Sequence, residues 1–498
     1  MDMQFDKMPV PYLQKVAGDL RFQEQTLEVR LPDGMPDIGR VLGAWGQVIV
    51  RGKEWNSDTM AVSCGVMAWV LYTPEDGDGV RSVEAWLPFQ MKWDLPDTHH
   101  DGKILVSCLL QGIDARSTSA RKLMVRANLS ALAEGWLSQR AQVAIPGEVP
   151  QDVSVLTATY PVQLPVEAGE KSFVLEEQLM PPAGNAKPEK LLYYSLQPEI
   201  IDKKVMAGKV VFRGSAIVHI LYRGEDEKLY TWDADIPFSQ YADLDGEYDD
   251  EPSVWVQLCV TSLDISQNEE GFTLKAGLLG QYILYDRTLV TVAEDAYSPR
   301  RPIEMQTEEL RLPAVLDRNG QILHGEANMQ TDAQQLVDVC FYPSYQQSRQ
   351  TDEGVALAVP GQFQTLYYDE EGQLRSAVTS WEGEWTMPVA RDSSVQTYVV
   401  PSGKPSGSVG AGSINVRADV YADTVTMSGQ GMAMITGMEL GEMEKPDPGR
   451  PGLVVCRKGD KRLWDLAKET GSTVDLILRT NRLDSEPEVD KVLLIPIP

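Results

Sequence analysis

The 498-residue sequence is poor in histidine and has no excess of basic charge. Its four histidines show no HExxH motif and no other paired ligand spacing, and the sequence contains no nucleophile-elbow motif. His99 and His100 are expected in a solvated loop after Pro96 rather than at a metal ion. The sequence therefore favours a protein that is not an enzyme, with no cofactor and no metal site.

Cysteine is also scarce, and its number is odd. The five cysteines are widely spaced and lie mostly in apolar, strand-like runs: Cys64, Cys108, Cys259, Cys340 and Cys456. This distribution is typical of reduced core thiols and not of a disulfide framework or a zinc site. The cysteines therefore favour a cytosolic protein.

Long hydrophobic runs are missing. No stretch approaches the roughly 18 to 20 apolar residues that a membrane-spanning helix needs. Residues Met1–Val10 contain Asp2, Asp6 and Pro9 without an apolar run, which does not fit a secretory signal. We therefore expect no transmembrane segment and a cytoplasmic location.

Charged residues are abundant, and most of them are acidic. The 73 acidic and 45 basic residues give a net charge of -28, which disfavours binding to nucleic acid or to an anionic membrane. The segment Gly452–Pro498 has eight acidic and eight basic residues and is neutral, so it differs in kind from the rest. A chain of this length exceeds a single core, so three or four domains are expected.

A short pattern occurs three times: apolar, any, apolar, basic, Ala, any, apolar. It spans Leu123–Leu129, Phe272–Leu278 and Ile414–Val420. Its alternation predicts a half-buried strand with the basic side chain facing outward. Each copy follows a polar turn and an earlier strand-like run, so each is the second strand of a hairpin. The chain therefore repeats one folding unit.

Two further features recur upstream of this pattern. A strand-like run closes on a Leu-Tyr pair before an acidic, Gly-containing turn, at Leu71–Tyr72, Leu221–Tyr222 and Leu366–Tyr367. The strand that follows is expected to end on Pro88–Phe89 in the first copy and on Pro237–Phe238 in the second. The third copy is degenerate at this point.

These repeats predict a mainly β fold, with three tandem antiparallel β-sandwich-like repeats before a small C-terminal domain. The predicted domains are 1–160, 161–300, a degenerate third repeat over 301–445, and 452–498. Linkers are expected at Pro146–Pro165 and Asp295–Pro302. The sequence leaves open whether each repeat is a sandwich or a closed barrel.

In the C-terminal segment, the spacing of apolar residues changes from that of strands to that of helices. It reads as strand, helix, helix, strand, with a helix through Leu463–Ala467 stopped by Gly471 and a second helix capped by Ser472 or Thr473. Trp464 lies at helical spacing with its apolar neighbours, so we expect it in the module core rather than at a contact.

This segment resembles the LysM module, through a set of matching residues: Gly459, Asp460, Leu463, Trp464, Ala467, Gly471, Leu476, Asn481, Leu493, Ile495 and Pro496. The resemblance implies a βααβ fold and a shallow groove for N-acetylglucosamine between the loop after the first strand and the loop after the second helix. The candidate binding residues are Gly459, Asp460, Lys461, Arg462, Asn481, Arg482 and Leu483.

Lys461 and Arg462 replace the one Thr or Ser that LysM modules carry after Gly-Asp. Because this changes the groove, and because Arg is common in protein interfaces, the two residues favour a protein contact.

The repeats resemble SPOCS-type repeats, which occur with a terminal LysM in the SipL-type coat morphogenetic proteins of spore-forming bacteria. The resemblance rests on the Leu-Tyr closings, the Pro-Phe pairs, the basic-Ala strand and Glu294–Pro299. It implies a scaffold of spore coat assembly at the forespore surface in the mother cell. The LysM domain would bind a coat ATPase, and the repeats would provide sheet edges for self-association.

Two other functions stay open. The first is a LysM-mediated peptidoglycan-binding protein, and the second is a cell-wall hydrolase with an unrecognised catalytic unit. A cytosolic chain disfavours both, because peptidoglycan lies outside the membrane.

Overall fold

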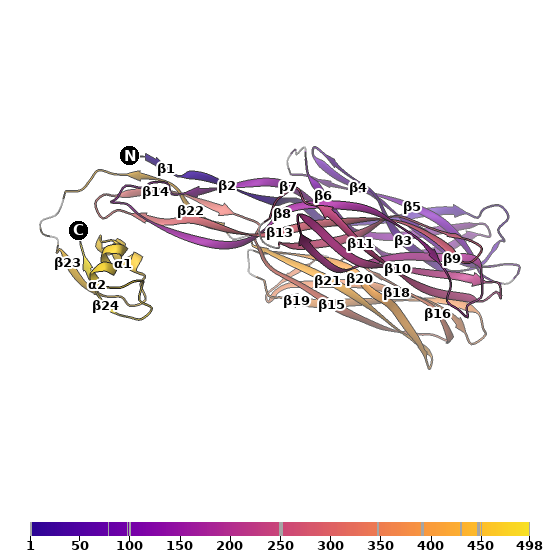
Figure 1. The fold of residues 1–498 in the computed structure, drawn as a ribbon. Helices are drawn as coiled ribbons and strands as arrows, with labels where there is room; N and C mark the ends of the chain where they lie inside the picture. The colour runs from indigo at the N-terminus through magenta and orange to yellow at the C-terminus, as the bar shows by residue number, and fades with distance from the viewer. Residues whose placement is uncertain are drawn as a thin grey trace.

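The computed structural model describes residues 2–77, 79–96, 98, 101–248, 252–345, 348–389, 393–428, 431–445, 449 and 451–497. These residues form a mainly β protein with several antiparallel sheets, as the sequence predicts. Figure 1 shows an elongated molecule, with a broad body at one end, a narrower stalk, and two short helices beside the far end of the stalk. Over these residues, no helix is long and apolar enough to cross a membrane.

The first part of the body, here the first unit, contains two three-stranded sheets. One sheet has the order β3 (Ile38–Asn56), β4 (Thr59–Pro74), β5 (Arg81–Asp94). The other has the order β2 (Asp6–Arg30), β7 (Lys122–Ile145), β6 (Lys103–Ser119). No backbone ladder joins the two sheets among the described residues, so the unit is a sandwich in this structure.

The second unit repeats this connectivity. One sheet has the order β9 (Pro188–Met206), β10 (Lys209–Gly224), β11 (Leu229–Asp243). The other has the order β8 (Ser154–Leu179), β13 (Phe272–Tyr297), β12 (Ser253–Gln267).

The third unit follows the same plan with one addition. Its first sheet contains β16 (Ala333–Pro343), β18 (Gly354–Asp369) and β19 (Leu374–Met387), with the short β17 (Arg349–Thr351) also paired to β18. Its second sheet has the order β15 (Val315–Gln330), β21 (Ser413–Ser428), β20 (Ser393–Gly410). The division of the chain into the predicted domains stays a prediction.

Strand β5 shows how the sequence specifies these sheets. Buried and outward-facing residues alternate along most of its length, and six apolar side chains lie on the inner face: Val83, Ala85, Leu87, Phe89, Met91 and Trp93. Since side chains of a strand point alternately to its two faces, this pattern fixes both the strand and its register.

The Leu-Tyr pairs have the same structural role in the first two units. Tyr72 and Tyr222 are fully buried, and each hydroxyl donates to a backbone carbonyl 36 residues upstream. The acceptors are Pro36 at 3.0 Å and Ala186 at 3.1 Å. Each tyrosine therefore anchors the turn that precedes the first strand of its sheet.

Two expectations about strand ends and linkers were wrong. Pro88 and Pro237 do not end their strands, since β5 continues to Asp94 and β11 to Asp243. Most of the expected linker Pro146–Pro165 is strand, because β8 starts at Ser154, and β13 extends into the second expected linker as far as Tyr297. Pro88, Pro237 and the β8 prolines Pro161 and Pro165 all lie on edge strands, where a missing N–H can face away from the ladder.

The stalk consists of strand ends that project from the body. It contains the first half of β2 paired with the end of β7, the first half of β8 paired with the end of β13, and the sheet of β14 (Ile303–Arg311), β22 (Gly431–Leu440) and β1 (Asp2–Gln4). A separate apolar core fills it, which includes Val143, Leu164, Val292, Ile435 and Met438. The stalk therefore has hydrophobic packing of its own.

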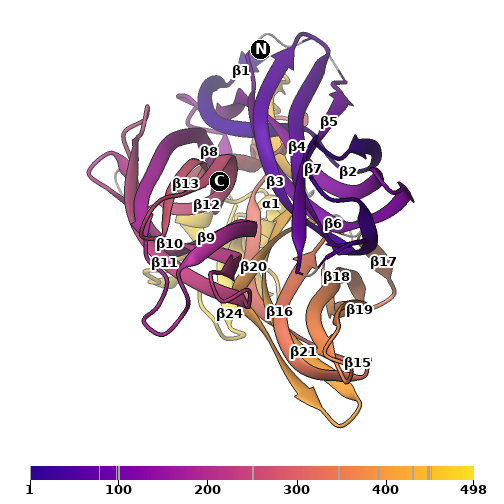
Figure 2. The same cartoon turned by 90° about the vertical axis from the view of Figure 1, so that its right-hand side faces the viewer.

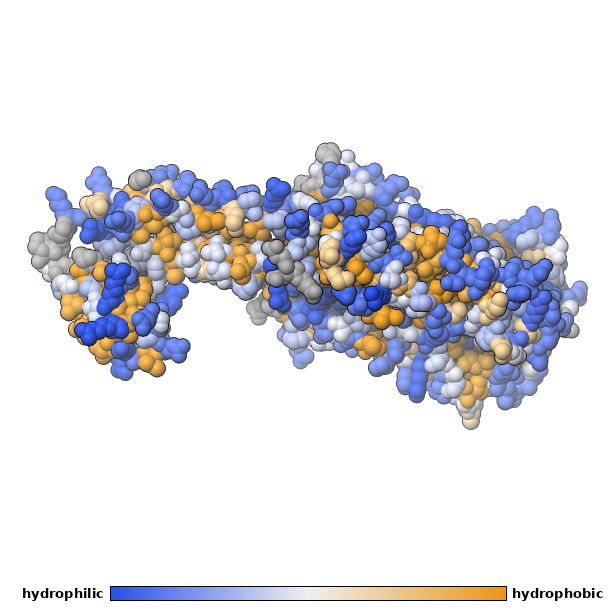
Figure 3. All heavy atoms as spheres, in the orientation of Figure 1, coloured by the Kyte–Doolittle hydropathy of each residue, from blue (hydrophilic) through white to orange (hydrophobic). Residues whose placement is uncertain are grey.

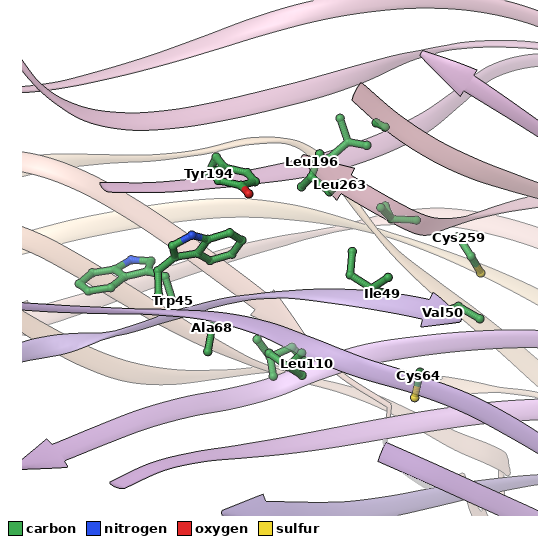
Figure 4. Close-up of a cluster of buried hydrophobic side chains, with 14 of the residues drawn as sticks. Trp45, Ile49, Val50, Cys64, Ala68, Leu110, Tyr194, Leu196, Cys259 and Leu263 are labelled. Atoms are coloured by element: carbon green, nitrogen blue, oxygen red, sulfur yellow. The ribbon is translucent and has the colours of Figure 1, made fainter. Parts of the chain in front are cut away.

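The three units surround the long axis of the body (Figure 2). One edge strand from each sheet lies near this axis, and these strands contact one another across unit boundaries: β3, β6, β9, β12, β16 and β20. Apolar side chains of β3, β6, β9, β12 and β16 form a shared core, part of which is drawn in Figure 4 with Trp45, Ile49, Tyr194 and Leu263. All five cysteines are free thiols, and Cys64, Cys259 and Cys340 are buried as expected.

A buried ion cluster joins the second unit to the third. His219 on β10 contacts Asp233 on β11 with Nδ1 to Oδ1 at 2.7 Å. Its Nε2 lies 3.0 Å from Oδ1 of Asp338 on β16, as an ion pair rather than a well-aligned hydrogen bond. Burial alone would lower the pKa of His219, but Asp338 and Asp233 outweigh it and raise this pKa from 6.5 to about 10. The imidazolium thus links two units.

We expect the substitution His219→Gln to destabilise the protein by roughly 3 kcal/mol at pH 6, because it leaves the buried carboxylate of Asp338 without its cation. A raised folded-state pKa stabilises fully below pH 6.5, and this contribution disappears as the pH rises toward 10. The difference in unfolding free energy between wild type and variant, measured by chemical denaturation, should therefore shrink between pH 6.5 and 10.

His324→Gln is the matched control. This histidine also contacts an aspartate, with Nδ1 at 2.8 Å from Asp419, but its side chain is 74% exposed. We expect a change within about 0.5 kcal/mol. Equal losses in the two variants, or a His219→Gln loss that does not vary with pH, would contradict the role of the cluster.

Candidate functional site

The C-terminal module consists of β23 (Leu453–Arg457), α1 (Leu463–Thr470), α2 (Val474–Asn481) and β24 (Val492–Pro496). The two strands pair antiparallel. Gly471 ends α1 in the left-handed conformation with φ of 67°, and the Thr473 hydroxyl accepts from the Leu476 amide at 3.3 Å to begin α2. Gly471 and Thr473 thus lie at the helix ends for which the sequence suggested them, whereas Asn481, expected after the second helix, is the last residue of α2.

The four predicted residues of the first loop lie between β23 and α1, and all but Gly459 have exposed side chains within this loop. Gly459 adopts φ of 56°. The Lys461 ammonium contacts Glu469 at 2.7 Å, and Arg462 contacts Asp465 at 3.2 Å. Both basic side chains are more than half exposed, so their partners leave them accessible from solvent.

The three predicted residues of the second loop have mainly structural contacts. The Asn481 side chain donates to the carbonyl of Ile477 at 2.8 Å and to that of Leu494 at 2.7 Å, and it accepts from the Leu494 amide at 2.9 Å. Arg482 adopts φ of 52° at the end of α2, and Leu483 packs on the module core. Asn481 therefore ties α2 to β24.

Two acidic residues that the sequence analysis missed bring the two loops together. Glu486 accepts from the Leu463 amide at 2.9 Å and lies 3.5 Å from the Lys458 ammonium. Asp490 accepts from the Gly459 amide at 2.8 Å. These carboxylates come from the segment between α2 and β24, and they satisfy backbone donors in the first loop and at the start of α1.

Trp464 is 8% exposed, but its burial depends on the stalk and not on the module alone. Its ring packs edge-on against Tyr297 of β13, with ring centroids 4.8 Å apart. Its Nε1 donates to Asp295 Oδ2 at 2.8 Å. Trp464 therefore belongs to the apolar cluster of the module, as expected, and also forms its contact with the stalk.

The outer face of the two-stranded sheet is apolar and exposed. Leu453 and Val455 on β23 are 49% and 64% exposed, and Val492 and Leu494 on β24 are 61% and 39% exposed. Figure 3 shows apolar surface on the module beside the stalk. Grouped apolar side chains of this kind are typical of interaction sites.

A cavity of about 470 Å³ lies where the three units meet. Its lining includes His219 with its two partners Asp233 and Asp338, together with Cys340 and Gln257. Burial, followed by the charge of Asp338, raises the pKa of the Cys340 thiol well above its ordinary value, so this thiol stays neutral. The cavity offers polar groups to a small molecule, but it does not activate Cys340 as a nucleophile.

The structure also brings together three acidic residues that the sequence did not point to. The carboxylates of Asp332, Asp369 and Glu371 lie within 4.8 Å of one another near the hairpin between β18 and β19. Asp369 is already paired with Arg375 at 2.7 Å and with the Gln373 amide at 2.6 Å.

The predicted loop residues His99 and His100 lie outside the described residues.

Residues 187–266 match the family model described as SipL, SPOCS domain. The SPOCS match spans β9, β10, β11 and nearly all of β12 in the second unit. Its strands have topological counterparts in β3–β6 of the first unit and in β16 and β18–β20 of the third. The C-terminal module lies outside the SPOCS match, and the chain matches no curated protein.

We expect Asn481→Ala to destabilise the C-terminal module by about 2 kcal/mol, since the substitution leaves the backbone groups of Leu494 without partners. Arg482→Gly should instead stabilise the module by roughly 0.5 to 1 kcal/mol, because glycine adopts the left-handed conformation without strain. Hydrogen exchange of α2 and β24 in the full chain measures both. Unchanged protection in Asn481→Ala would show that this side chain does not tie the helix to the strand.

Proposed function

We propose that this chain is a non-enzymatic scaffold of spore coat assembly. In this proposal the three units are SPOCS-type repeats, and the C-terminal module is a LysM domain that binds a coat protein partner at the forespore surface. The single observation that carries the proposal is the SPOCS match at residues 187–266.

The recurrence of one connectivity in all three units supports the extension of this assignment beyond the matched residues. The buried tyrosines Tyr72 and Tyr222 with equivalent acceptors support it as well. A scaffold needs a stiff frame, and the continuous apolar cores of body and stalk are consistent with one.

The module supports a role in partner binding through two surfaces. Lys461 and Arg462 are exposed on one loop, and the apolar face of β23 and β24 is exposed on the sheet. A partner with acidic residues around an apolar patch would fit both. An ATPase of the coat basement layer is the partner that we propose, and self-association of the repeats is a further possibility within the same role.

Glycan binding is the alternative function. Glu486 and Asp490 accept hydrogen bonds from the Leu463 and Gly459 amides, so these backbone donors beside the first loop are already satisfied, which favours a protein partner over a sugar. A protein of the mother-cell cytoplasm, the location that we propose, also has no contact with peptidoglycan. The cell-wall hydrolase is the least supported of the three functions.

The test is an affinity pull-down from sporulating cells, with recovered proteins identified by mass spectrometry. The full chain should recover a coat ATPase, and a chain truncated after Lys445 should lose it. The double substitution Lys461→Glu with Arg462→Glu should lower its recovery about tenfold, which corresponds to about 1.4 kcal/mol.

Lys275→Glu is the control, since this exposed lysine lies on the second unit and pairs with Glu176 at 2.8 Å. It should leave recovery unchanged. If the truncated chain keeps every partner while the full chain binds muropeptides, the proposed function is wrong and glycan binding replaces it.

A further inference from the structure

The end of β13 carries an acidic and an aromatic residue on one face, and both contact helix α1. Asp295 accepts from Trp464 Nε1 at 2.8 Å, and its two oxygens lie 2.7 and 2.8 Å from the Lys468 ammonium. Burial alone would raise the pKa of Asp295, but hydrogen bonds from Lys468 and Trp464 hold it below the ordinary value. The carboxylate is therefore bound as an anion.

Tyr297, two residues further along, completes the contact. Its ring meets the Trp464 ring at an angle of 76°, and its hydroxyl donates to the Ser472 carbonyl at 3.1 Å. Tyr297 and Trp464 are 6% and 8% exposed, and Leu156 of the paired strand packs on the same cluster. The contact thus combines a charge pair, aromatic packing and a hydrogen bond to the Ser472 carbonyl.

An irregularity in the ladder places these side chains. The register of β13 with β8 shifts between Ala293 and Asp295, so that Glu294 is an extra residue opposite the partner strand. A β-bulge of this kind redirects the side chains that follow it. Ala296 remains in the stalk core, whereas Asp295 and Tyr297 face the module.

The other stalk hairpins do not carry this segment. After the corresponding Val-Ala of β7, the chain continues with Ile145, Pro146 and Gly147 in place of Glu294–Pro299. The end of β22 has no acid followed two residues later by tyrosine. The acid and aromatic pair is therefore specific to the hairpin that the module contacts.

Without the stalk, α1 would present an exposed tryptophan beside a lysine. Tryptophan and cationic side chains together are typical of the centre of a protein interface, and an acidic residue beside an aromatic ring is the complementary surface. The segment of β13 has this complementary chemistry. Because this segment belongs to the same chain as α1, its effective concentration at α1 is high.

We propose that the α1 face of the module, formed by Trp464, Lys468 and the Ser472 carbonyl, recognises an acidic strand segment with an aromatic residue, and that Asp295 and Tyr297 occupy it within the chain. An external partner that uses this face presents the same chemistry and displaces the stalk. This displacement rests on the proposed function, whereas the recognition by α1 does not.

The test uses the full chain labelled with 5-fluorotryptophan, in which the ¹⁹F resonance of Trp464 is identified by its loss in Trp464→Phe. In the double variant Asp295→Asn with Tyr297→Ala, we expect this resonance to move toward that of a solvent-exposed tryptophan. A synthetic peptide with the sequence of residues 290–299 should return it to its wild-type position, and should bind the variant at least tenfold more tightly than it binds wild type.

Two controls make the result specific. Thr291→Ala changes a half-buried residue of the same hairpin whose hydroxyl lies 2.9 Å from that of Thr159 on the paired strand, and should leave the resonance in place. The peptide that carries both substitutions should not bind. The milder variant Asp295→Asn alone should shift the resonance partway, which covers the case in which the double variant unfolds.

The proposal is overturned if the Trp464 resonance is the same in all variants, or if the peptide binds wild type and double variant equally or binds neither. Because the peptide assay does not use the coat partner, its outcome is independent of the pull-down. Peptide binding with no loss of partners on truncation would refute the proposed function and leave this inference standing. The reverse pattern would refute the inference alone.

Discussion

Unpaired strand edges at the centre of the body have to be satisfied by side chains, and the assembly of the three units depends on how this is done. A backbone N–H or C=O that is buried without a partner costs free energy comparable to a lost hydrogen bond. Gln281 of the second unit donates to the Val106 carbonyl at 2.8 Å and accepts from the Val106 amide at 3.0 Å. It thereby extends the edge of the first unit without a further strand.

The same solution occurs at other unit boundaries. Gln47 of the first unit accepts from the Leu196 amide at 2.9 Å, and the Tyr342 hydroxyl of the third unit accepts from the Gly46 amide at 3.2 Å. Together with the His219 cluster, these contacts are directional. Apolar packing on the axis is less specific, so the polar contacts select the order and rotation of the units around it.

Local patterns allowed much of the fold to be predicted from the sequence. The alternation along β5 depends on residues close in the chain, and Gly471 at the end of α1 and Thr473 at the start of α2 have known capping preferences. The linker prediction failed because the prolines of β8 were interpreted as breaks. Whether a strand lies at a sheet edge, where proline is tolerated, is a tertiary property.

The candidate site was less predictable, for a related reason. Glu486 and Asp490 act through backbone donors of a loop more than 20 residues away in sequence, so no short motif marks them. His219 and Asp338 come from different units, and the cavity around them exists only after the units assemble. Trp464 has helical spacing with apolar residues, a pattern that does not distinguish a core position from a contact with another part of the chain.

Two edge strands of the stalk carry prolines, with Pro9 and Pro11 on β2 and Pro161 on β8. A neighbouring strand cannot form a regular ladder along such an edge, because donors are missing at intervals of a few residues. These two edges are thus protected against edge-to-edge pairing with a strand of another molecule. A molecule that approaches the stalk along β2 or β8 therefore meets side chains and not a free backbone ladder.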